Sequence, residues 1–193
     1  MDDLTALAAR LVDAPSEAAR LGLVRTLVRF GPAALRLAEV RGMRVVALAR
    51  GERFTARSRR LRELAPHLDT WPTPPAGLFV VEERTAYLRS RSPLAAAHEF
   101  GHALDCALGE GAYRSNEDGD LRSIFASATA FVTPYAATAP DEFFAELLRA
   151  YVECNDRRSP WPAATRARLR EVDARAFAYV ERLFAHGFAE ALP

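Results

Sequence analysis

Two histidines spaced four residues apart form the strongest chemical signal in the sequence. His98 and His102 enclose Glu99 in the stretch His-Glu-Phe-Gly-His, an HExxH motif inside a predicted helix. Positions four apart project from the same face of a helix, so both imidazoles can reach one zinc ion. Glu99 is offset toward a water molecule bound to that ion and could accept its proton. The motif therefore predicts two zinc ligands and a general base on one helical turn.

The surroundings of this motif favour a buried site over a solvated charged face. The neighbouring side chains are apolar nearly all round the helix: Ala95, Ala96, Ala97, Phe100, Ala103 and Leu104. Buried histidine and glutamate side chains require polar partners. Asp105 lies three residues after His102, on the same side of the helix. We expect its carboxylate to accept the second ring hydrogen of a ligand histidine.

A catalytic zinc ion needs a third protein ligand and an open coordination position for water. The best candidates are Glu142 and Glu146, which lie four residues apart on one face of a later predicted helix. From the residues alone, one of them binds the metal and the other supports it. The remaining acidic and histidine candidates are weaker: Glu110, Glu153, His67 and His186.

The pattern of apolar residues predicts an α+β protein with a small twisted mixed β-sheet. We expect a helical N-terminal annex over residues 1–41 and a second domain over residues 42–193. The apolar residues have helical spacing in the first segment, whereas short runs of β-branched residues begin after Gly42. Strands are expected within residues 43–49, 77–81 and 85–89. Helices are expected over residues 50–62, 93–108, 120–131, 141–154 and 162–186. Ser92 and Pro93 are a capping hydroxyl and a proline at the start of the helix that carries the histidines.

Composition and charge exclude several classes of function. A chain of 193 residues can bury a hydrophobic core without disulfides, and we expect Cys106 and Cys154 to be buried free thiols. The 26 basic and 25 acidic residues nearly cancel, so we expect neither a nucleic-acid nor a membrane partner. The sequence has no long apolar run and does not begin like a signal peptide. We expect a cytoplasmic protein, with non-classical export left open.

Arginines gather between residues 50 and 62, where Glu52 interrupts them. One interpretation is a patch for an anionic partner. A solvated helix face is favoured, because aromatic residues that could stack on bases do not alternate with the arginines.

With these residues in place, the sequence resembles the HExxH-plus-Glu zinc metallopeptidases, or gluzincins, represented by the anthrax lethal factor catalytic domain and Mlc titration factor A. The resemblance rests on residues 98–105 and 133–153. Tyr135 precedes Glu142 by seven residues, which is the spacing between the tyrosine and the glutamate ligand in that family. The resemblance implies a zincin-like fold, one Zn2+ ion per chain, and hydrolysis of a peptide or protein substrate.

The resemblance also implies a role for each matching residue. It makes His98, His102 and Glu142 the zinc ligands and Glu99 the general base. It makes Tyr135 the donor that stabilises the oxyanion of the transition state.

Supporting elements are implied in the same way. Glu146 and Asp105 match positions that support the ligands, and residues 85–89 match an edge strand that pairs with an extended substrate. Two alternatives to an ordinary peptidase stay open. One is a regulatory binding protein that keeps the peptidase fold and sequesters a protein partner, and the other is a protease toxin effector delivered to another cell.

Overall fold

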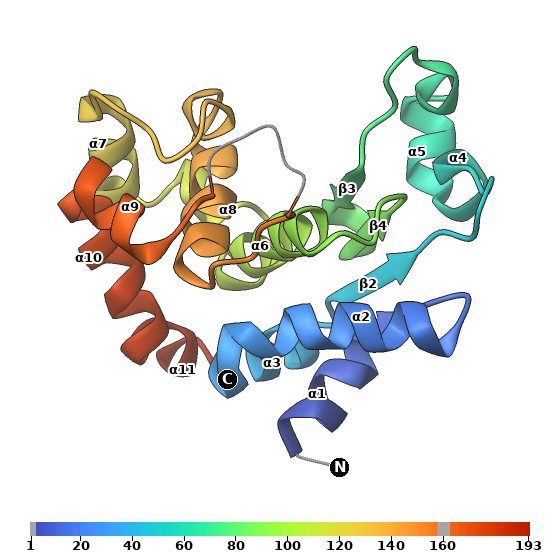
Figure 1. The fold of residues 1–193 in the computed structure, drawn as a ribbon, viewed down its shortest axis with the longest axis horizontal. Helices are drawn as coiled ribbons and strands as arrows, with labels where there is room; N and C mark the ends of the chain where they lie inside the picture. Colours follow the sequence, from blue (N-terminus) through green and yellow to red (C-terminus); the bar gives the residue numbers. More distant parts are fainter. Residues whose placement is uncertain (1–2, 158–162) are drawn as a thin grey trace.

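A four-stranded mixed sheet surrounded by helices forms the framework of the computed structural model, which describes residues 3–157 and 163–193 (Figure 1). The order of the strands is β1-β2-β4-β3. The first three in this order are parallel, and β3 runs antiparallel to β4. The strand bounds are β1 (Val12–Asp13), β2 (Arg44–Ala47), β3 (Gly77–Val80) and β4 (Thr85–Leu88). The predicted α+β class with a small mixed sheet is confirmed.

The expectation that residues 85–89 form an edge strand is wrong. β4 lies between two strands, because Tyr87 pairs with Val46 of β2 on one side and with Leu78 of β3 on the other. A tight turn that ends at Arg84, in a left-handed conformation (φ 49°), returns the chain from β3 to β4. Among the described residues β3 pairs only with β4, so β3 is the edge strand on this side of the sheet.

Three N-terminal helices cover part of the same core that holds the motif helix. They are α1 (Asp3–Leu11), α2 (Glu17–Leu27) and α3 (Gly31–Val40), as the helical spacing of the apolar residues predicts. Phe30 packs edge-on against Phe100, with ring centroids 4.9 Å apart. β1 was not expected, since two residues are too few to show the alternation of a strand. The division of the chain at residues 41 and 42 stays a prediction.

Residues 48–76 form a lobe on the other face of the sheet, at the upper right of Figure 1. The expected helix over residues 50–62 is two short helices, α4 (Phe54–Arg57) and α5 (Arg59–Leu64). They are separated at Ser58, whose backbone is extended and whose hydroxyl accepts a hydrogen bond from the Leu61 N–H at 3.0 Å. Six buried side chains form the small core of this lobe: Val46, Leu48, Phe54, Leu68, Val80 and Tyr87.

Two helices carry the histidines and glutamates of the candidate site, α6 (Pro93–Leu108) and α8 (Pro140–Tyr151). The bounds of α6 are those predicted, and the Ser92 hydroxyl accepts a hydrogen bond from the Ala95 N–H at 3.2 Å. The helices approach closely at Gly101, where an added Cβ would lie 2.9 Å from Cα of Ala145. A glycine is therefore required in α6 at this crossing, and it sets the distance from which α8 reaches the histidines.

The rest of the chain is helical. α7 (Gly119–Ser127) ends earlier than expected, and α9 (Arg166–Val172), α10 (Ala174–Arg182), a π-helical turn (Leu183–Gly187) and α11 (Phe188–Glu190) replace the single helix expected over residues 162–186. That helix is divided at Asp173, which caps α10, and its predicted start at Pro162 lies outside the described residues. Short 3₁₀ turns are Val28–Phe30, Leu68–Thr70, Val81–Glu83, Arg114–Asn116 and Tyr135–Ala137.

Two further expectations concern the cysteines and the membrane. Cys106 and Cys154 are buried free thiols, as expected. No helix in the described part of the chain has the length and apolar character needed to cross a membrane.

Candidate metal centre

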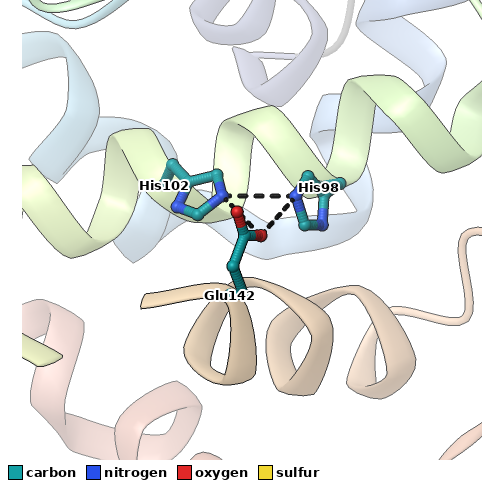
Figure 2. Close-up of side chains that lie close together, drawn as sticks. All are labelled: His98, His102 and Glu142. Atoms are coloured by element: carbon teal, nitrogen blue, oxygen red, sulfur yellow. Dashed lines mark hydrogen bonds and ion pairs between the residues drawn. The ribbon is translucent and has the colours of Figure 1, made fainter. Parts of the chain in front are cut away.

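Helices α6 and α8 bring His98, His102 and Glu142 together (Figure 2). Nε2 of His98 lies 3.2 Å from Nε2 of His102. Oε2 of Glu142 lies 3.1 Å from the first of these nitrogens and 3.2 Å from the second. Atoms that bind zinc tetrahedrally at ordinary bond lengths are about 3.3 Å apart. The triangle of donor atoms therefore has the size of one face of a zinc coordination tetrahedron.

The charged groups around His98 also favour a bound cation. Burial alone would lower the pKa of His98, but hydrogen bonds to Glu142 and Glu146 outweigh it and raise this pKa to about 10. Burial would likewise raise the pKa of Glu142, but its hydrogen bonds to His102 and His98 hold that pKa far below its usual range. The pocket thus strongly favours a positive charge beside these carboxylates, and a divalent metal ion can take the place of the proton.

Glu146 lies behind His98 and is held by three side chains. Its Oε1 is 3.0 Å from Nδ1 of His98. Arg149 donates two hydrogen bonds of 2.7 Å to the two carboxylate oxygens, and the Thr133 hydroxyl donates another of 2.6 Å. Burial would raise the pKa of Glu146, but the hydrogen bonds from Arg149 and His98 lower it to about 2. The carboxylate is therefore ionised and acts as an acceptor.

Arg149 is a site residue that the sequence analysis missed. Its side chain is buried, with 2% of the residue exposed, and it also donates hydrogen bonds to the Cys154 carbonyl and the Asn155 side chain. Its position three residues after Glu146, on the same face of an apolar helix, is the signal that could have indicated a buried ion pair.

Glu99 is buried beside the triangle, and β3 fixes its position. Burial raises the pKa of Glu99 above its usual range. An added Cβ at Gly77, the first residue of β3, would lie 2.6 Å from Cγ of Glu99. Any larger residue at position 77 would therefore push the Glu99 side chain out of its place.

Tyr135 stands at the exposed side of the triangle. Its hydroxyl donates a hydrogen bond of 3.1 Å to Oε1 of Glu142, and its ring centroid is 5.3 Å from that of His98. Burial and the Glu142 carboxylate raise the pKa of Tyr135, so the hydroxyl stays protonated and able to donate. With 52% of its surface exposed, the residue is accessible to solvent.

Asp105 does not make the expected contact with a histidine ring. Its carboxylate accepts hydrogen bonds from the backbone N–H and the hydroxyl of Ser115, which occupy both of its oxygens. Nδ1 of His102 is buried without a hydrogen-bond partner among the described residues. Burial raises the pKa of Asp105 to about 6.

The weaker candidates from the sequence are not part of the triangle. Within the described residues, the cluster that could hold a metal ion consists of His98, His102 and Glu142. It does not include Glu110, Glu153, His67 or His186.

A cleft of about 250 Å³ opens beside His98 and Glu99. Its lining includes the entry to β3, Pro75 to Gly77, and the segment Thr133 to Tyr135. Leu94 and Ala95 of α6 also line it. The arrangement places a buried carboxylate and a tyrosine hydroxyl around a small, mostly apolar space next to the three donor atoms.

Comparisons with known proteins identify the fold. No family model and no curated protein sequence matches the chain. The structure is similar to that of the PRO-PRO endopeptidase PPEP-2 from Paenibacillus alvei, with a TM-score of 0.67 and 17% sequence identity. The match covers 92% of this chain and 99% of that one. The chain therefore has a zincin-like α+β fold.

Proposed function

We propose that the protein is a zinc-dependent metallopeptidase that hydrolyses peptide bonds. The observation that carries this proposal is the triangle of His98, His102 and Glu142 with Glu99 beside it in the cleft. Two histidines and a glutamate are a ligand set typical of catalytic zinc, which keeps one coordination position open. The similarity to an endopeptidase over nearly the whole chain supports the same function.

The proposal assigns a chemical task to the metal and to Glu99, Tyr135 and Glu146. Zinc held by His98, His102 and Glu142 would lower the pKa of a bound water to about 7 and polarise the scissile carbonyl. Glu99 would accept a proton from the attacking water and return it to the leaving amine. Tyr135 donates a hydrogen bond to the oxyanion as the carbonyl carbon becomes tetrahedral. Glu146 holds the His98 ring through Nδ1, which would leave Nε2 available to bind the metal.

The substrate is an extended peptide that adds to the edge of β3 that has no partner strand in the described part of the chain. An exposed strand edge binds extended chains through backbone hydrogen bonds. The cleft includes both Gly77 at the start of β3 and Glu99, so a peptide on this edge would enter the cleft beside Glu99. The name of the structural neighbour states that it acts on Pro-Pro sequences, and the small apolar walls formed by Pro75, Leu94 and Pro134 suit proline side chains. Peptides with paired prolines are therefore the first substrates to test.

The decisive experiment compares the native protein with Glu99→Gln. Both are loaded with one equivalent of zinc and incubated with a peptide library that includes Pro-Pro sequences. We expect cleavage by the native protein and none by Glu99→Gln, which keeps the shape of the side chain but cannot accept a proton. Equal zinc content in both proteins is the control. Cleavage that survives Glu99→Gln would contradict the assigned role, and zinc binding with no cleavage of any peptide would favour the regulatory binding protein.

A further inference from the structure

A second hollow, about 400 Å³ in volume, lies at the end of the sheet where β2 and β4 finish. Its lining consists of residues 48–53, Asp69, Arg89 and Arg91. These segments directly follow the two parallel strands, and the carboxyl ends of parallel strands are a frequent place for ligands. We call this hollow the arginine pocket.

The arginine pocket has an excess of positive charge. Its four arginines face two carboxylates, and both carboxylates are already occupied. Asp69 pairs with Arg89 and accepts hydrogen bonds from the N–H groups of Phe54 and Thr55, at 2.9 and 3.0 Å. Glu52 accepts a hydrogen bond of 2.7 Å from the Ala49 N–H.

Three of its arginines are free to bind a ligand. Arg50, Arg53 and Arg91 are exposed, and none of them forms an ion pair with another described residue. Other arginines of the same lobe do have such partners: Arg57 pairs with Asp13, and Arg59 pairs with Glu63. The solvated helix face predicted from the sequence thus applies to part of this stretch, while Arg50 and Arg53 precede α4 and border a concave site.

The arginine pocket is close to the catalytic cleft. The N–H group of Leu48, which lines the pocket, donates a hydrogen bond to the Leu88 carbonyl. Leu88 is in turn the β-sheet partner of Gly77, which lines the cleft. Leu48 and Gly77 are therefore two strand spacings apart, about 10 Å. The Ala76 carbonyl, also at the cleft, accepts hydrogen bonds from the N–H groups of Arg89 and Ser90.

We propose that the arginine pocket binds the carboxylate of an acidic residue in the peptide substrate. This rests on the proposed peptidase function. Leu48 lies across the sheet from Gly77, so the acidic residue belongs to the part of the peptide that continues past the start of β3. At about 3.3 Å per extended residue, at least three residues separate it from the residues held in the cleft. The planar forks of arginine match a carboxylate, and the free arginines can form charge-assisted hydrogen bonds with it.

The test uses pairs of peptides that share one cleavable core and differ by Glu or Gln at positions two to five residues on either side of the scissile bond. We expect kcat/KM for the Glu member to exceed that for the Gln member by about five- to tenfold at one position, as for a few exposed ion pairs. The preference should shrink at high salt. It should vanish in a variant with Arg50→Gln, Arg53→Gln and Arg91→Gln, while the Gln peptide is cleaved as before.

A matched control is Arg122→Gln. Arg122 is exposed on α7, outside the arginine pocket, and its replacement should leave the preference for Glu unchanged. Equal cleavage of the Glu and Gln peptides by the native protein overturns this inference while the peptidase function stands.

A binding experiment distinguishes failure of this inference from failure of the proposed peptidase function. If no peptide is cleaved, the same peptide pairs are titrated into the native protein. Tighter binding of the Glu peptide that the triple variant loses supports the arginine pocket, and equal binding overturns it. Inorganic phosphate that competes with the Glu peptide supports a shared anion site. Phosphate binding without any preference for Glu overturns the inference, because the pocket then serves a free anion.

Discussion

The carboxylate of Glu146 accepts a hydrogen bond from Nδ1 of His98, with the two atoms 3.0 Å apart. The other nitrogen of the same ring, Nε2, lies 3.1 Å from Oε2 of Glu142. The two glutamates of α8, four residues apart, therefore contact opposite sides of one imidazole. Because Glu146 is an acceptor, it would keep a proton on Nδ1, and the lone pair of Nε2 would then be available to a metal held between His98, His102 and Glu142.

Replacing Glu146 should weaken both zinc binding and the fold. In Glu146→Ala the buried Arg149 loses its ion-pair partner, so we expect the free energy of unfolding to fall by about 3–5 kcal/mol. The His98 ring loses its support, so zinc affinity should fall by about 10- to 100-fold. Urea unfolding and competition with a chelator measure these effects. Glu146→Gln, which retains an acceptor for His98, should lose less affinity, and native zinc affinity in Glu146→Ala would contradict the supporting role.

Tyr135→Phe separates the oxyanion donor from the metal site. The substitution removes the hydroxyl that lies 3.1 Å from Glu142 and leaves the ring in place. Loss of such a donor costs about 2.7–4 kcal/mol of transition-state stabilisation, so kcat should fall by about 10²- to 10³-fold. Zinc content and KM should change little, as checked by elemental analysis and steady-state kinetics. Normal turnover in this variant would reject the role.

Gly77→Ala tests whether β3 positions the general base. The new methyl group would lie 2.6 Å from Cγ of Glu99, so the side chain must shift from the place where the proposal has it accept a proton. We expect a strongly reduced kcat with bound zinc and an unchanged circular dichroism spectrum. Gly119→Ala is the control, since an added Cβ there meets no atom within 4 Å and the position lies on α7. Full activity of Gly77→Ala would show that Glu99 is not held by this contact.

Zinc affinity should rise with pH. In the metal-free protein the pKa of His98 is raised from 6.5 to about 10, so the proton on His98 stabilises the fold fully below about pH 6.5 and this stabilisation is lost as the pH rises through 10. Zinc must displace that proton, so the apparent affinity should increase about tenfold per pH unit between about pH 7 and 9. Chelator competition at several pH values measures the slope. An affinity independent of pH would contradict a proton shared between His98 and its glutamates.

Local signals in the sequence predicted the elements that carry the site. Ser92 and Pro93 mark the start of α6, and the apolar residues that follow define its length, so the predicted and observed bounds agree. The four-residue spacing of His98 and His102 depends only on helix geometry. The contact between Glu142 and the two histidines could be predicted only from the family resemblance, which singled out Glu142 by its spacing from Tyr135.

Features that depend on contacts distant in sequence were not predictable in the same way. β4 lies inside the sheet because it pairs with β2. The lobe of residues 48–76 separates β2 from β4 in the sequence, and the sequence pattern does not show where that lobe packs. Ser115 takes both oxygens of Asp105 because an intervening loop folds back onto α6, which no spacing on the helix reveals. Arg149 looks like an ordinary surface charge until its ion pair with Glu146 is seen.

The metal content of the purified native protein tests the central claim most directly. Elemental mass spectrometry, without and with added zinc, is applied to the native protein and to His102→Ala, which lacks one corner of the donor triangle. We predict one zinc ion per chain in the native protein and little in the variant. Little or no zinc in the native protein, even after zinc has been offered, would contradict a zinc peptidase.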